Sequence, residues 1–159
     1  MIIRPDYICA IRPFIDAPLV KILSGVRRCG KTTVLEMLKG ELISRGVSEN
    51  NIIERRYTAF AFDDYTAKDM SRDLLSAMDG KGRCYLLLDE VQEIAGWEKV
   101  VNSLLENEDA DLYVTGSNSK LMSSEISTYL TGRYVSIPVY TLSLREYLVF
   151  KGKASRTPA

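Results

Sequence analysis

The sequence contains no histidine. Histidine is the side chain that most readily exchanges a proton near neutral pH, and it is the commonest protein ligand of transition metals. Its absence excludes histidine-based acid–base catalysis and histidine-ligated zinc sites. Cysteine is scarce as well: Cys9, Cys29 and Cys84 are scattered and form no Cys-x-x-Cys pair. Neither a zinc site nor a disulfide framework is therefore predicted, and free thiols suit a reducing cytoplasm.

The sequence also lacks an excess of either charge. Its 21 Lys and Arg residues balance 21 Asp and Glu residues, so no molecule-wide field favours nucleic acid, although a local basic patch stays open. No apolar run approaches the ~20 residues that span a bilayer, and the N-terminal residues do not resemble a signal peptide. We expect a soluble, cytoplasmic protein that does not enter membranes.

One short motif predicts a phosphate-binding site. The 159 residues, 46% of them apolar, suffice for one domain, and residues 25–32 match the Walker A pattern G-x-x-x-x-G-K-[ST]. The glycines allow a tight turn whose N–H groups point at phosphate oxygens. Lys31 is predicted to reach the β- and γ-phosphates, and the Thr32 hydroxyl to bind Mg²⁺. The predicted nucleotide-binding residues are Gly25, Val26, Arg27, Arg28, Cys29, Gly30, Lys31, Thr32 and Thr33.

The flanking segments fit this interpretation. An apolar, β-rich segment over 19–23 precedes the motif, and apolar residues at helical spacing follow it as far as Arg45, before Gly46. A strand before and a helix after the loop are the context that the motif requires. The alternative is a glycine-rich turn without a ligand, but that alternative does not require the Lys-Thr pair.

A second motif lies about 58 residues beyond the first, where the apolar run 84–88 ends in Asp89 and Glu90. The run predicts a strand buried on both faces, and ligands bind at the carboxyl ends of such strands. This Walker B pattern predicts that Asp89 holds Mg²⁺ and that Glu90 activates the attacking water. The alternative is a solvated turn. A carboxylate beside the metal ligand favours hydrolysis over transfer to a small-molecule acceptor.

Two further polar positions are weaker candidates for catalysis. Thr115-Gly116-Ser117-Asn118 follows another apolar strand, and Asn118, or else Ser117, is predicted to orient the water or contact the γ-phosphate. An ordinary N-cap and turn explains these residues equally well. Arg133 is a candidate arginine finger or sensor, and a surface arginine is the alternative.

The rest of the chain alternates between strand and helix patterns, which predicts an α/β sandwich with a largely parallel sheet. Residues 1–18, with three prolines, are expected to form an irregular leader packed on the domain edge. Strands are expected over 19–23, 52–62, 84–88, 112–115 and 134–140, and helices over 31–45, 69–78, 97–105, 124–130 and 142–150.

The motif segments together resemble the AAA-type prokaryotic ATPase family. The resemblance covers about residues 18–150 and includes the segments 25–32, 88–92, 96–98, 115–121, 130–134 and 142–147. It implies a three-layer P-loop NTPase sandwich with strand order 5-1-4-3-2, which places Lys31, Asp89, Glu90 and Asn118 around one phosphate. Members of the family normally continue into a C-terminal domain. The expected organisation is thus a leader over 1–18, an ATPase domain over 19–150 and a tail over 151–159 at a probable truncation point.

The sequence therefore predicts an ATPase domain. We expect Mg²⁺-dependent ATP binding and hydrolysis, with Lys31, Glu90, Asn118 and Arg133 as catalytic candidates and Thr32 and Asp89 as metal ligands. An effector domain or partner protein would read the nucleotide state. The alternatives are a nucleotide-binding switch with little turnover, a small-molecule P-loop kinase and, less favoured by the balanced charge, a DNA-binding module. The sequence leaves the partner and the oligomeric state open.

Overall fold

A five-stranded, all-parallel sheet organises the protein. The computed structural model describes residues 3–117, 121 and 128–152. The strands are β1 (Val20–Ser24), β2 (Ile52–Arg56), β3 (Cys84–Asp89), β4 (Ala110–Gly116) and β5 (Tyr134–Pro138). They pair in the order β2-β3-β4-β1-β5, and each pair is parallel. This is the predicted order 5-1-4-3-2 in reverse, so the predicted topology is confirmed.

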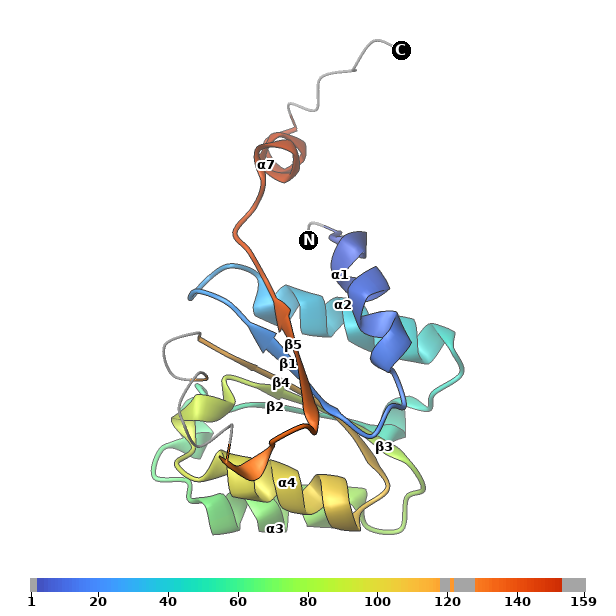
Figure 1. The fold of residues 1–159 in the computed structure, drawn as a ribbon, viewed down its shortest axis with the longest axis vertical. Coiled ribbons are helices and arrows are strands. Elements are labelled where there is room, and N and C mark those ends of the chain that lie inside the picture. Colours follow the sequence, from blue (N-terminus) through green and yellow to red (C-terminus); the bar gives the residue numbers. More distant parts are fainter. Residues whose placement is uncertain (1–2, 118–120, 122–127, 153–159) are drawn as a thin grey trace.

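Helices cover both faces of this sheet, as Figure 1 shows. One face carries α1 (Pro5–Ile11) and α2 (Lys31–Ser44), and the other carries α3 (Ala67–Met78) and α4 (Trp97–Asn107). Each face has its own apolar core, one including Ile8, Leu23 and Leu38 and the other Ile22, Leu74 and Val101. The predicted three-layer sandwich is therefore confirmed.

The burial of the strands follows from this layering. All residues of β1, β3 and β4 are buried, whereas β2 and β5 lie at the sheet edges and are partly exposed. Continuous apolar runs such as residues 84–88 are typical of strands covered on both sides. Because the strands are parallel, their carboxyl ends all lie at the same end of the sheet. The predicted motifs follow these strand ends.

Three sequence-based expectations need correction. The leader is not irregular: it forms α1, since Pro5 stands in the first helical turn, where no N–H donor is required, and Ile8 and Ile11 are buried. The strand expected over 52–62 ends at Arg56. The Tyr57 N–H still donates to the Asp89 carbonyl of β3 (3.1 Å), but the Ala59 N–H then bonds back to the Arg56 carbonyl (3.2 Å), and a 3₁₀ turn follows at Phe60–Phe62.

The last strand is also shorter than expected: β5 ends at Pro138, directly after which the Val139 N–H donates to the Ser24 carbonyl of β1 (2.7 Å). The helix expected over 124–130 falls mostly outside the described residues. In the part of the chain that the structure describes, no helix is long and apolar enough to cross a membrane.

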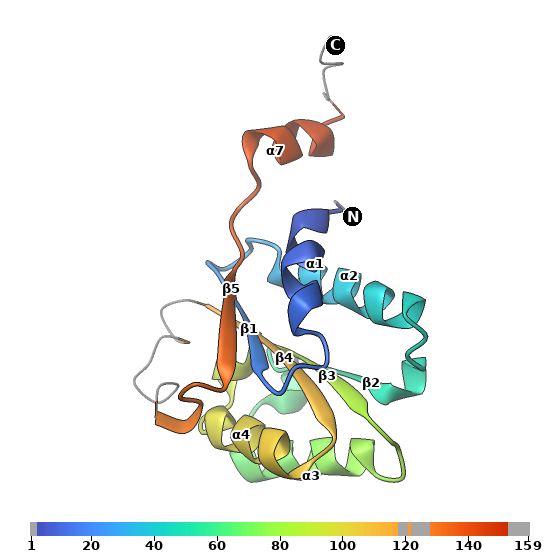
Figure 2. The ribbon, with the colours of Figure 1, turned by 45° about the vertical axis from the view of Figure 1, so that its right-hand side comes forward.

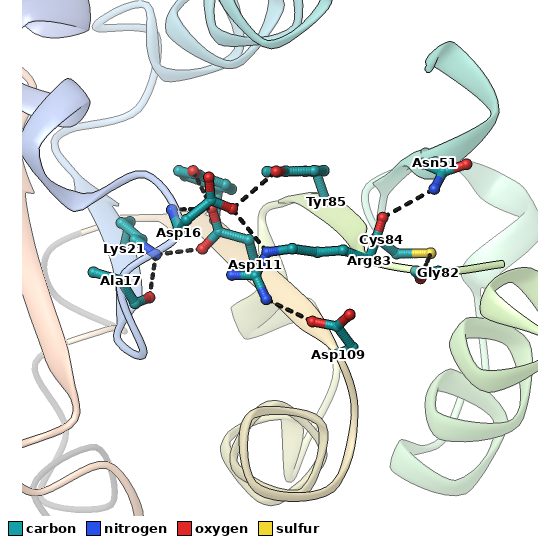
Figure 3. Close-up of polar contacts among 11 residues, drawn as sticks. Asp16, Ala17, Lys21, Asn51, Gly82, Arg83, Cys84, Tyr85, Asp109 and Asp111 are labelled. Atoms are coloured by element: carbon teal, nitrogen blue, oxygen red, sulfur yellow. Dashed lines mark hydrogen bonds and ion pairs between the residues drawn. The ribbon is translucent and has the colours of Figure 1, made fainter. Parts of the chain in front are cut away.

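A buried ionic network fixes the amino half of the sheet, at the end opposite the predicted site (Figure 3). The Lys21 ammonium on β1 pairs with the Asp111 carboxylate on β4, and both side chains are fully buried. Lys21 Nζ also donates to the Ala17 carbonyl (2.8 Å), and the Asp16 N–H donates to Asp111 (2.9 Å). Burial lowers the pKa of Lys21, although Asp111 opposes this effect. The segment before β1 is thereby tied to the sheet.

The last described helix, α7 (Leu144–Phe150), stands apart from both layers at the end of an extended segment that follows β5 (Figures 1 and 2). It begins with a capping box in which the Ser143 hydroxyl accepts from the Glu146 N–H and the Glu146 carboxylate accepts from the Ser143 N–H. None of its residues is buried. Its placement thus depends on few contacts.

Candidate functional site

The predicted phosphate loop connects the carboxyl end of β1 to the first turn of α2. Gly30, directly before the helix, has a φ of 103°, which side-chain-bearing residues rarely adopt. A Cβ on Gly25 would lie 2.3 Å from the Val139 carbonyl oxygen, so this position needs glycine for close backbone packing. The loop therefore places the free N–H groups at the start of α2 beside the carboxyl ends of the strands. These N–H groups and the positive end of the helix dipole favour a bound anion.

Lys31 is folded back over this loop. Its ammonium donates to the carbonyl oxygens of Gly25 and Val26, both at 3.0 Å, and lies 3.7 Å from Glu90 Oε1. The residue is only 3% exposed. The ammonium is thus held inside the loop and beside the second motif.

Thr32 and Asp89 join the two motifs directly. The Thr32 hydroxyl donates to Asp89 Oδ2 at 2.8 Å, and Asp89 is buried at the end of β3. The other Asp89 oxygen accepts from the Thr115 hydroxyl on β4, and Arg56 Nε lies 3.4 Å from Oδ2. A hydroxyl and a carboxylate side by side are the hard oxygen ligands that Mg²⁺ prefers.

Glu90 follows Asp89 in a left-handed backbone conformation with a φ of 57°. Its N–H donates to the Thr115 hydroxyl (2.9 Å), and its carboxylate accepts a hydrogen bond from the Gln92 side-chain amide. Gln92 in turn packs against the end of β4, where a Cβ on Gly116 would lie 2.4 Å from Gln92 Oε1. The backbone and side chain of Glu90 are both fixed by named neighbours.

Thr32, Asp89, Glu90 and Gln92 line one cleft of roughly 720 Å³ at the carboxyl ends of the strands. The phosphate loop, the end of β2, the Asp89–Glu90 corner and Ser117 all contribute to its walls. Among the described residues no cluster of three or more potential Cys, Asp or Glu metal ligands occurs. Thr32 and Asp89 still fit Mg²⁺, because this ion keeps several waters and takes few protein ligands.

The structure brings together most, but not all, of the predicted site. Lys31, Thr32, Asp89 and Glu90 meet as described, and Ser117 lines the same cleft. Asn118 lies outside the described residues.

Arg133 does not join this site. It precedes β5, its carbonyl accepts from the Val20 N–H at the amino end of β1, and its side chain pairs with Glu106. The phosphate loop leaves the opposite end of β1, five residues of parallel strand away. The structure thus places Arg133 away from the phosphate loop of its own chain, and its candidacy as an arginine finger or sensor stays a prediction.

Thr115 and Gln92 are among the residues that contact the predicted acids and had not been singled out. Thr115 belongs to a noted segment, but its link to Asp89 and Glu90 depends on β3 and β4 being neighbours. Gln92 lies two residues beyond Glu90, and only the turn Val91–Glu93 brings its amide back to that carboxylate. No local pattern in the sequence marks either contact.

Comparisons with known proteins agree with this fold. A model of the family described as AAA domain matches residues 17–148. An uncharacterised protein of Haemophilus influenzae is 35% identical over 159 residues, which cover 99% of this chain and 40% of that protein. The chain thus spans about two fifths of the length of this curated relative.

Two solved structures are similar in fold. AMPPCP-bound DnaA from Aquifex aeolicus matches with a TM-score of 0.57 at 16% identity, covering 96% of this chain and 52% of that one. Hsp104 in its closed state with ATPγS and FITC casein matches with a TM-score of 0.64 at 17% identity, covering 96% and 29%. At this level of identity the likeness concerns the fold alone.

Proposed function

The chain belongs to the AAA domain family, and on that premise we propose that it binds ATP at the phosphate loop and hydrolyses it with the help of Mg²⁺. The observation that carries the proposal is the meeting of two sequence-distant motifs at one cleft. Thr32 contacts Asp89, and Lys31 lies beside Glu90, although 57 and 59 residues separate the members of these pairs.

The phosphate loop is proposed to bind the triphosphate. Loop and helix N–H groups would surround the phosphates, and Lys31 would exchange its two carbonyl acceptors, Gly25 and Val26, for phosphate oxygens. The exchange replaces neutral acceptors with charged ones, which strengthens each hydrogen bond. The fold neighbours support nucleotide binding, since two of them were solved with AMPPCP or ATPγS.

Thr32 and Asp89 are proposed to hold Mg²⁺, through the hydroxyl and carboxylate oxygens that now contact each other. A bound Mg²⁺ neutralises charge on the phosphates. Thr115 donates to Asp89 and thereby leaves one carboxylate oxygen oriented toward Thr32.

Glu90 is the proposed general base. Water attacks the γ-phosphorus, its proton passes to the Glu90 carboxylate, and the bond from the γ-phosphorus to the bridging oxygen breaks to leave ADP. Glu90 is placed for this step because it lines the cleft beside Lys31. Lys31 would stabilise the charge that develops on the transferred group.

The first experiment measures nucleotide binding by calorimetry and phosphate release for three proteins: wild type, Lys31→Ala and Glu90→Gln. We expect Lys31→Ala to lower ATP affinity by about 10- to 100-fold, because a charged hydrogen-bond donor is lost. Glu90→Gln should retain ATP binding while turnover falls by about 10²–10⁴-fold.

Two variants at surface ion pairs serve as controls, one for the lysine and one for the glutamate substitution. Lys39→Ala removes a lysine of α2 that pairs with surface glutamates, and Glu106→Gln removes the partner of Arg133. Both should behave as wild type. Unchanged ATP affinity in Lys31→Ala would refute the loop as the binding site, and full turnover in Glu90→Gln would refute Glu90 as the base.

Binding without turnover in wild type would instead favour a nucleotide-dependent switch. In either case we propose that a further domain or a partner protein reads the nucleotide state, since the matched relative is more than twice as long as this chain.

A further inference from the structure

Arg4 is a buried charged residue that the proposed chemistry does not use. It precedes α1, is only 4% exposed, and lies 4.5 Å from the centre of the Tyr7 ring. Its guanidinium reaches three separate parts of the chain. Nη1 donates to the Cys29 carbonyl (2.9 Å), Nη2 to the Tyr140 carbonyl (2.8 Å), and Nε to Glu146 Oε1 (2.8 Å).

The first of these contacts fixes the phosphate loop. Cys29 directly precedes Gly30, and a Cβ on Gly30 would lie 3.3 Å from Arg4 Nη1, so the guanidinium packs on the loop itself. Because Arg4 binds the Cys29 carbonyl from outside, it holds the loop at the point where the chain enters α2. A loop held in advance loses less conformational freedom when a ligand binds.

The other contacts fix α7. No residue of α7 is buried, and Glu146 reaches Arg4 with both carboxylate oxygens (2.8 and 3.4 Å). The Tyr7 hydroxyl adds a hydrogen bond from the Tyr140 N–H (2.9 Å). A cavity of roughly 290 Å³ between the loop and α7 is lined by Arg4, Gly30, Leu142 and Phe150, among others. The loop and α7 are therefore neighbours through Arg4.

A buried guanidinium makes these contacts depend on one another. Separating it from its carboxylate or its carbonyl acceptors leaves buried charge without compensation, which is costly. A change in the conformation of the phosphate loop therefore alters the contact between Arg4 and Glu146. A change at Glu146 likewise alters the contact between Arg4 and the Cys29 carbonyl of the loop.

Building on the proposed nucleotide site, we propose that Arg4 is a positioning residue of the phosphate loop and that, through Glu146, it couples nucleotide binding to the placement of α7. Thermodynamic linkage makes this coupling reciprocal: nucleotide changes the α7 attachment, and the α7 attachment changes nucleotide affinity.

The test begins with the nucleotide-free 159-residue chain. Glu146→Gln keeps a side chain that completes the capping box but removes the charge that faces Arg4. Amide hydrogen exchange in residues 27–31 should become faster in this variant, although residue 146 lies far away in the sequence. Arg12→Lys is the matched control, because Arg12 pairs with Glu41 of α2 and not with the loop. Unchanged exchange in the loop would overturn the proposal.

The second step adds Mg-ADP. In wild type, nucleotide should change the exchange of residues 143–150. In Arg4→Lys and Glu146→Gln this response should disappear, and Mg-ADP affinity should fall by about tenfold. The double variant should lose no more affinity than either single one, since both break the same link. Additive losses, or a response that persists in Arg4→Lys, would overturn the coupling.

The two proposals fail differently. A wild-type chain that binds no nucleotide refutes the proposed function. A wild-type chain that binds nucleotide with no Arg4-dependent change at α7 refutes the coupling and leaves the function standing.

Discussion

Glu90 combines a proposed chemical role with a backbone conformation that few residues other than glycine adopt, with a φ of 57°. Such conformations cost roughly 1–3 kcal/mol and persist where the surroundings impose them. Here Thr115 holds the Glu90 N–H, and the Gln92 amide holds its carboxylate. The orientation of the proposed base thus depends on two residues that carry none of the chemistry.

Gln92→Ala should therefore lower turnover while leaving ATP affinity nearly unchanged. We expect kcat to fall by about tenfold, since the carboxylate loses one fixed hydrogen bond of about 1–2 kcal/mol. Single-turnover phosphate release and calorimetry measure the two quantities.

Gly116→Ala also disturbs this contact, because the added methyl would lie 2.4 Å from Gln92 Oε1, although it would meet Leu121 Cγ at 2.6 Å as well. It should lower kcat in the same direction, whereas the surface variant Lys39→Ala should not. A wild-type kcat in Gln92→Ala would show that Glu90 is oriented without it.

Arg133→Ala should leave ATP turnover by the isolated chain within about twofold of wild type, because Arg133 lies at the amino end of β5 and pairs with Glu106. Steady-state phosphate release at low protein concentration is the measurement. A large loss of kcat under these conditions would mean that Arg133 reaches a phosphate site after all.

Among single residues, the sequence predicted those that belong to the two motifs. Lys31, Thr32, Asp89 and Glu90 were identifiable because each stands in a motif whose spacing carries the chemistry. Thr115, Gln92 and Arg4 were not, because their contacts arise from strands and segments that meet only in the folded chain.

Among the elements, α7 has no buried residue, and its Glu146 forms an ion pair with Arg4. The hydrogen bond from Arg4, with the Ser143 N–H, lowers the pKa of Glu146 to about 2. Because the native pKa lies below the ordinary value, the ionised carboxylate stabilises this attachment fully above about pH 4.5. The stabilisation is lost as the pH falls toward 2.

A proton titration followed by the NMR shift of the Ser143 amide checks this. In wild type the amide should keep its shift down to about pH 3. In Arg4→Lys the midpoint should move up toward the ordinary glutamate value, because the bidentate contact is weakened. A wild-type midpoint near the ordinary value would contradict the ion pair.

Two of the elements that the sequence misjudged are α1 and β2. Three prolines suggested an irregular leader, yet Pro5 fits the first turn of α1, and burial of Ile8 and Ile11 stabilises the helix. Apolar residues beyond Arg56 suggested a longer strand, yet the Ala59 N–H bonds back to the Arg56 carbonyl and the chain turns. Burial thus decides in favour of α1, and a local turn ends β2.

On the scale of the whole molecule, the sheet order came from resemblance to a family and not from local periodicity, which assigns strands but does not order them. The structure confirms the order. It adds a feature that no pattern indicated, the buried Lys21–Asp111 pair in the amino half of the sheet.

Asp111→Asn should destabilise the protein by about 3–5 kcal/mol, because it leaves the Lys21 ammonium buried without its counter-charge. Urea unfolding measures the change. Asp109→Asn, which alters a mostly exposed carboxylate, is the control and should cost less than about 1 kcal/mol.

The paired replacement Lys21→Met with Asp111→Leu should cost less than Asp111→Asn alone, since it removes both charges. A double variant as unstable as the single one would assign the effect to the lost Tyr113 and Asp16 hydrogen bonds of Asp111.

The parallel pairing of β1 with β5 has a mechanical consequence. The chain leaves the carboxyl end of β5 toward α7, and β5 is joined along its whole length to β1. A pull on α7 therefore acts along the strand axis and loads the hydrogen bonds of this ladder together, in shear, so that they do not open one after another. The strand that shares the tension is the one that ends in the phosphate loop, so force applied at α7 is borne next to the proposed nucleotide site.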